Sequence, residues 1–175
     1  MKLRPLLFPL LLLLPVASIP LCSAVISQES LPPAIRSELD RAYPGWQPAA
    51  VSPDVEKLFQ AVRPRAQRWL IEGDFTGEGH RDFAVQIVVP FEGHEVRVVS
   101  AFLQRSGGYK RVELERGQVN PNIYLWLLKR GHRDVQAHTG RLFTFPRDAV
   151  GVESTGPSVA YLFEQGSFKR IWLGI

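Results

Sequence analysis

The sequence predicts an α+β protein, in which two N-terminal helices pack on a largely antiparallel meander sheet of seven or eight strands. Three observations predict this fold class. Apolar residues recur with a helical period up to Val62 and with a period of two from Gln67 onward. The strand-like segments follow one another through short turns, as hairpins do. No intervening segment is long enough for the crossover that parallel strands require, so antiparallel pairing is expected.

The first helix is expected at residues 31–43. Ser30 is a suitable N-cap, and prolines are tolerated in the first turn, where the backbone N–H groups have no helical partner. Pro44 and Gly45 end the helix. The apolar positions form one stripe at helical spacing: Leu31, Ile35, Leu39 and Ala42. We expect this stripe to pack on the sheet.

A second, shorter helix is expected at residues 53–62. Ser52 is its predicted N-cap, Asp54 favours the first turn, and Pro64 stops the helix. The expected buried face consists of Val55, Leu58, Phe59 and Val62. This pattern predicts a second helix lying on the same sheet as the first.

The strands are expected in the remainder of the chain. Trp69 and Ile71 lead into an acidic, glycine-rich loop, and Trp172 belongs to a closing hairpin around Gln165 and Gly166. The strand segments are residues 83–89, 96–103, 109–114, 123–128, 142–145, 149–152, 159–163 and 168–173.

The first 24 residues have the layout of a secretory signal peptide. A short basic start precedes an apolar run at residues 6–16, and small residues offer a cleavage site after Ala24. Proline interrupts the run, which is too short to span a membrane. We therefore expect a periplasmic or secreted single domain of residues 25–175. The alternative is a lipoprotein anchored at Cys22, the only cysteine, although Leu21 is larger than the residue usual before a lipidated cysteine.

Charge and cysteine content bound the function further. The formal charge is +4, of which Lys2 and Arg4 in the predicted leader contribute two, and the other basic residues are scattered. A nucleic-acid partner is therefore not expected. The exported chain would contain no cysteine, so burial rather than disulfides must stabilise it.

The acidic loop carries the most specific pattern in the chain. Its oxygen-bearing residues occupy positions 1, 3, 5, 7 and 9, a spacing at which they can converge on a hard cation such as Ca²⁺. The predicted ligands are Asp74, Thr76, Glu78, the backbone carbonyl of His80, and Asp82. Gly77 and Gly79 supply the positive φ that a tight loop needs. The other reading is a metal-free turn whose aspartates accept backbone N–H groups.

Residues 73–85, GDFTGEGHRDFAV, resemble the calcium loop of FG-GAP or VCBS-type repeats, whose usual pattern is G-D-F-[DN]-G-D-G-x-x-D-[LY]-A-V. The resemblance implies a strand-loop-strand unit in which Asp74, Thr76, Glu78 and Asp82 bind Ca²⁺. If the loop binds Ca²⁺, the affinity expected is that of extracellular modules, with a dissociation constant on the order of 0.1–1 mM. Thr76 and Glu78 depart from the pattern, which reduces the charge at position 3 and lengthens the side chain at position 5. A single copy cannot build the β-propeller that such repeats usually form.

The overall layout resembles small secreted bacterial proteins of unknown function. These proteins begin with a helix that ends in Tyr-Pro-Gly-Trp, as at residues 43–46, carry one such loop, and end in a strand like residues 168–172. The resemblance implies export and brings no activity with it.

The sequence therefore favours an exported, non-enzymatic module that binds a protein or glycan partner across its sheet. The alternative is a small periplasmic hydrolase that uses a carboxylate such as Glu113 or Asp82, and a third reading is a purely structural envelope module. Glu113 and Glu115 are two residues apart on a predicted strand and are expected on one face of it. A concave pocket holding a carboxylate with a raised pKa would favour the hydrolase.

Overall fold

The computed structural model describes residues 31–62, 68–154 and 158–174. The predicted signal peptide, Cys22, the N-cap Ser30 and the helix stop Pro64 lie outside the described residues. Neither of the two helices in this part of the chain, each ten residues long, could cross a membrane.

The fold is mostly β with several sheets, so the prediction of an α+β protein with one meander sheet was wrong. The described residues contain eleven strands in three sheets, and only two short helices. The physical reason lies in β3 (Asp82–Phe91), where seven of the first eight residues are buried. A strand that is buried on both faces needs a covering layer on each side, and one layer of helices cannot provide both.

The helices and strands are as follows. The five-stranded sheet has the order β1-β3-β4-β5, with β2 also paired to β3, and the four-stranded sheet has the order β11-β10-β9-β6. The helices are α1 (Pro33–Ala42) and α2 (Pro53–Val62). The first sheet contains β1 (Gln47–Pro48), β2 (Leu70–Gly73), β3, β4 (His94–Arg105) and β5 (Gly108–Gln118). The second contains β6 (Tyr124–Leu128), β9 (Ala149–Glu153), β10 (Ser158–Glu164) and β11 (Ser167–Leu173), and β7 (Arg133–Val135) pairs with β8 (Leu142–Thr144).

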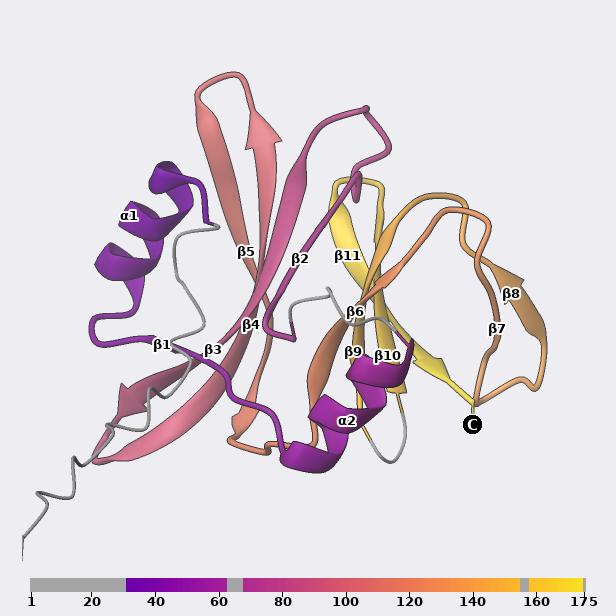
Figure 1. Ribbon diagram of the computed structural model, residues 1–175. Helices are drawn as coiled ribbons and strands as arrows, with labels where there is room; N and C mark the ends of the chain where they lie inside the picture. The colour runs from indigo at the N-terminus through magenta and orange to yellow at the C-terminus, as the bar shows by residue number, and fades with distance from the viewer. Residues whose placement is uncertain (1–30, 63–67, 155–157, 175) are drawn as a thin grey trace, which may run out of the picture.

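The layers follow from the two faces of the five-stranded sheet (Figure 1). Helix α1 covers one face, where Leu39 packs with Val85 and Val98 in one hydrophobic cluster. The four-stranded sheet covers the other face, where a second cluster joins β3 and β4 to β9 and β10. The hairpin β7–β8 lies beyond the four-stranded sheet and contributes Phe143 to a third cluster.

The predicted stripe of α1 is confirmed. Ile35 and Leu39 are completely buried and Leu31 nearly so, all in the cluster between α1 and the sheet. The structure begins the helix at Pro33 with Pro32 as the N-cap residue, two residues later than predicted. Proline is suited to these first positions because its fixed φ is helical and it has no N–H to leave unpaired.

The prediction for α2 is correct in part. Val55 and Phe59 are buried against Tyr124 of β6, and the Ser52 hydroxyl accepts the N–H of Val55 at 3.4 Å, as an N-cap residue does. Leu58 is 52% exposed, so its predicted burial was wrong. Helix α2 packs beside β6 rather than on the sheet that α1 covers. This small contact leaves Leu58 outside the buried stripe.

Candidate functional site

The acidic loop joins β2 to β3 and closes through its own aspartates. Gly77 and Gly79 have φ values of +75° and +78°, which confirms the positive φ expected at both. The Asp74 carboxylate accepts the N–H of Gly79 at 3.0 Å, and the Asp82 carboxylate accepts the N–H of Thr76 at 3.1 Å. Backbone N–H groups therefore occupy acceptors that were predicted to be metal ligands.

Asp82 is completely buried and ties the loop to β4. Its Oδ1 accepts the N–H of Gln104 at 2.8 Å, while its Oδ2 accepts that of Thr76. Burial raises the pKa of Asp82, although the hydrogen bonds from Gln104 and Thr76 oppose the rise. Asp82 is not among the residues that line the three cavities at Asp74, at Glu113 and at His138.

Two further predicted ligands, Glu78 and His80, lie at the surface of the loop. Glu78 is exposed and pairs with Arg105 at 3.3 Å, and His80 is exposed as well. Within residues 31–62, 68–154 and 158–174, no three His, Cys, Asp or Glu side chains are placed to hold a metal ion. In this structure Glu78 pairs with an arginine, and both oxygens of Asp82 accept backbone N–H groups.

A cavity lies beside β5, where the five-stranded sheet faces the β10–β11 hairpin of the four-stranded sheet. Its volume is about 440 Å³, and it lies between β5 and the end of the β10–β11 hairpin. It is lined by Lys110, Arg111, Val112, Glu113, Leu114, Tyr161, Gly166, Ser167 and Phe168. We call this cavity the edge groove, because β5 is the last strand of its sheet and has no strand partner on its outer side among the described residues.

A bulge in β5 shapes the groove. Val99 of β4 pairs with Glu115, and the next residue, Ser100, pairs with Glu113, so Leu114 is an extra residue in β5. The extra residue reverses the alternation of side chains beyond it. Glu113 therefore points to α1 and Glu115 to the four-stranded sheet, and the prediction that the two share a face was wrong.

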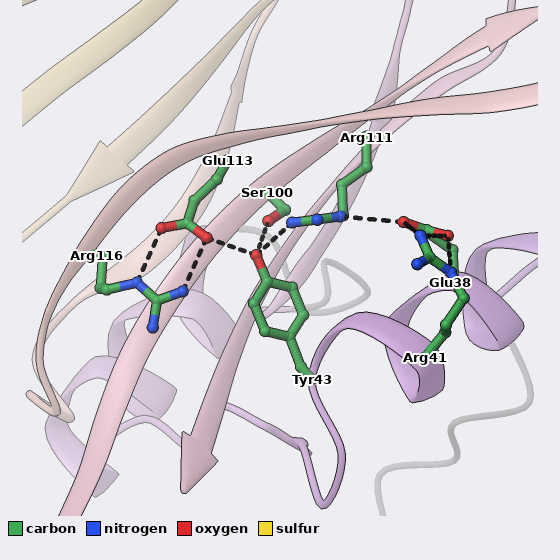
Figure 2. A network of polar contacts seen from close by, with 7 residues as sticks. All are labelled: Glu38, Arg41, Tyr43, Ser100, Arg111, Glu113 and Arg116. Carbon is green, nitrogen blue, oxygen red and sulfur yellow. Dashed lines mark hydrogen bonds and ion pairs between the residues drawn. The ribbon is translucent and has the colours of Figure 1, made fainter. Parts of the chain in front are cut away.

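On the α1 side, Tyr43 joins the helix to β5 (Figure 2). Its hydroxyl donates to Glu113 at 2.6 Å and accepts from Arg111 Nη1 at 2.5 Å. Arg116 binds both oxygens of Glu113 at 2.9 Å, and Arg111 continues to Glu38 at 3.2 Å. Figure 2 shows the tyrosine between these two ion pairs, which hold the end of α1 over β5.

The network fixes the protonation of its members. Two hydrogen bonds from Arg116, helped by one from Tyr43, outweigh burial and hold the pKa of Glu113 below its ordinary value. Burial and the neighbouring Glu113 raise the pKa of Tyr43. Glu113 is therefore an ionised acceptor at neutral pH, and its lowered pKa is the opposite of what the hydrolase reading requires.

On the opposite face, β5 is held by a second, more buried cluster. Arg97 of β4 forms an ion pair with Glu115, and Tyr161 of β10 donates to the same carboxylate at 2.7 Å. Burial opposes ionisation of Glu115, but the hydrogen bonds from Tyr161 and Arg97 outweigh it, so its pKa lies below the ordinary value. The cluster thereby joins β5 to its neighbour β4 and to β10 of the four-stranded sheet.

The arginines and tyrosines of these two clusters were not predicted from the sequence. Tyr43 belongs to the quoted motif at residues 43–46, but the motif alone gives no partner for its hydroxyl. Residues 111–116, Arg-Val-Glu-Leu-Glu-Arg, place two arginines and two glutamates close together in the sequence, and this was the available signal for charge pairing. Which face each member takes depends on the bulge at Leu114, which the sequence pattern does not mark.

We predict that Glu113→Gln flattens the acid limb of the stability–pH curve. Because folding lowers the pKa of Glu113 from 4.5, its ion pair stabilises the native state above about pH 4.5 and is lost as the pH falls through the folded value. Urea unfolding between pH 6 and pH 3 should therefore show a smaller loss of stability in the variant. Glu164→Gln, which removes a partly exposed carboxylate paired with Lys169, is the control and should retain the wild-type slope. Equal slopes for wild type and Glu113→Gln would contradict the prediction.

Comparison with protein-family models, with curated proteins and with solved structures found no match to this chain.

Proposed function

We propose that the protein is an exported, non-enzymatic binding module that docks an extended segment of a partner protein in the edge groove, along β5. Export rests on the leader pattern of residues 1–24, and the docking site rests on the structure of β5. The observation that carries the proposal is a strand edge without a strand partner, in the described part of the chain, that lies along a cavity of about 440 Å³.

A free strand edge presents a row of backbone N–H and C=O groups, and an extended peptide can pair with them as an additional strand. Residues from both faces of β5 line the groove: Arg111 and Glu113 from the α1 side, and Val112 and Leu114 from the side of the four-stranded sheet. Because both faces contribute, the outer edge of β5 lies along the cavity.

The side chains of the groove favour an apolar residue and an acidic residue in the docked segment. Val112, Leu114 and Phe168 supply apolar surface, and pockets beside a strand edge give side-chain specificity to backbone pairing. Lys110 is exposed and has no ion-pair partner among the described residues, whereas Arg111 is paired with Glu38. A carboxylate of the partner would complement the charge of Lys110.

The groove is also held rigid before any partner arrives. The Tyr43 network fixes one face of β5, and the cluster of Arg97, Glu115 and Tyr161 fixes the other. A preorganised strand loses little conformational entropy on binding, so backbone pairing contributes more of its energy to affinity. These contacts favour a binding role over the hydrolase reading, because Glu113, a carboxylate that the hydrolase reading would use for catalysis, is used here to position β5.

We expect linear peptides selected from a random phage-displayed library on the wild-type protein to bind in the edge groove. Lys110→Glu should weaken them by at least about tenfold, which corresponds to roughly 1.4 kcal/mol, because the reversed charge repels an acidic residue. The matched control is Lys57→Glu, the same change at an exposed position of α2, which should leave the affinity unchanged.

Hydrogen exchange of the wild type with a selected peptide gives the second measurement. Amide protection is expected to increase within residues 108–118, since a docked strand pairs with that edge. Peptides that bind equally well to Lys110→Glu, or that protect other segments but not β5, would contradict the proposal. A library that yields no binder would favour the purely structural envelope module.

A further inference from the structure

The acidic loop contacts a segment that lies far from it in the sequence. The connector between β8 and β9 contains Pro146, Arg147 and Asp148. Arg147 Nη1 donates to the carbonyl oxygen of Thr76 at 2.5 Å. A Cβ atom added to Gly77 would lie 3.4 Å from the Arg147 guanidinium carbon. The guanidinium group therefore lies against the loop backbone at its third and fourth positions.

Asp148 makes the reciprocal contact. Its Oδ2 accepts the N–H of Asp74 at 3.2 Å, the first residue of the loop, and its Oδ1 accepts the N–H of Arg130 at 2.9 Å. Gly73 permits this approach, because a Cβ there would be 3.0 Å from Asp148 Oδ2 and 2.8 Å from Leu127 Cδ1. Adjacent residues of one connector thus offer a donor and an acceptor to the same loop.

The same side of the loop contains an acidic and a basic group in one cavity. Asp74 and Arg147 both line a cavity of about 280 Å³, together with Gly77, Arg130, Pro146 and Asp148. Asp74 Oδ1 and Arg147 Nε are buried and have no hydrogen-bond partner among the described residues. The carboxylate at position 1 therefore shares a cavity with a positive charge, and the buried atoms of the two groups are incompletely screened by water.

We propose that Arg147 takes the place of a calcium ion in the acidic loop, so that the loop of residues 74–82 is closed by a guanidinium group and needs no metal. The donor geometry carries this inference: the Thr76 carbonyl accepts from Arg147, both oxygens of Asp82 accept backbone N–H groups, and Glu78 pairs with Arg105. A divalent cation brought to Asp74 would meet the positive charge of Arg147 and be repelled by it.

The first test compares thermal melts of the wild-type protein in EDTA and in 10 mM Ca²⁺, which should coincide. A calcium site with a dissociation constant of about 0.1 mM would raise the melting temperature by roughly 5–10 °C under these conditions. Such a rise in the wild type would overturn the proposal, because the loop would then depend on a metal.

The second test removes the guanidinium. Arg147→Ala should lower the melting temperature by roughly 3–10 °C, as expected for the loss of a charge-assisted hydrogen bond in a domain of this size. Arg130→Ala is the matched control, since it removes an exposed arginine from the same cavity, and its melting temperature should stay within about 1 °C of wild type.

Arg147→Lys covers the case in which the alanine variant does not fold. It retains the charge but not the planar fork, and an intermediate melting temperature is expected. Equal melting temperatures for wild type, Arg147→Ala and Arg147→Lys would overturn the proposal. So would equal losses for Arg147→Ala and Arg130→Ala, which would assign the effect to net charge rather than to the contact with Thr76.

Discussion

Replacing Glu115 with alanine is expected to lower the free energy of unfolding by about 3–5 kcal/mol, the range for breaking a buried ion pair from one side. The Arg97 side chain is only 6% exposed and that of Glu115 16%. Without Glu115, Arg97 would be a buried charge with no counter-ion, and Tyr161 would lose the acceptor of its hydroxyl. Equilibrium unfolding in urea measures the loss directly.

Glu113→Ala is the matched control, because it removes the same side chain two residues away on the other face of β5. Glu113 is partly exposed and Arg116 remains near solvent without it, so a loss of about 1 kcal/mol is expected. A second variant separates burial from charge. Arg97→Met combined with Glu115→Leu removes both charges, and it should recover most of the stability lost by Glu115→Ala.

A loss below about 1 kcal/mol for Glu115→Ala would contradict the burial of the pair. A double variant as unstable as the single one would show that the pair contributes through its own geometry rather than by neutralising a buried charge. The first of these outcomes would also require revision of the assignment of Glu115 to the face opposite Glu113, since that face makes it the partner of Tyr161.

The sequence predicted individual elements better than their assembly. Most strand segments were placed correctly, including residues 83–89 within β3 and 96–103 within β4, because alternation of apolar residues is a local property. The short strands β1 and β7 were not predicted, since two or three residues contain too little pattern to recognise. Local periodicity gives no information on which strands pair, and this is why one predicted meander is several sheets.

The candidate site was predictable only in part, for a similar reason. The positive φ of Gly77 and Gly79 and the acceptor role of Asp74 follow from the loop sequence. Arg147, in contrast, is 71 residues from the carbonyl of Thr76 that it binds. Contacts of that separation depend on the packing of one sheet against another, which a single sequence does not encode in any local pattern.

The final prediction concerns the contact between α1 and the five-stranded sheet, where Leu39→Ala is expected to lower the free energy of unfolding by about 2–5 kcal/mol. Leu39 is completely buried in the cluster that contains Val85 and Val98, so the truncated side chain leaves a cavity that the strands cannot fill.

The chain offers a matched control in Leu58, which is 52% exposed on α2 and carries the same side chain in a helix of the same length. Leu58→Ala should change stability by less than about 0.5 kcal/mol, because most of its surface already meets water. Urea unfolding of the two variants compares them under one condition. Equal losses for the two leucines would show that α1 does not dock on the sheet. The Tyr43 network would then lack its support, because the hydroxyl that binds Glu113 and Arg111 is positioned by the end of this helix.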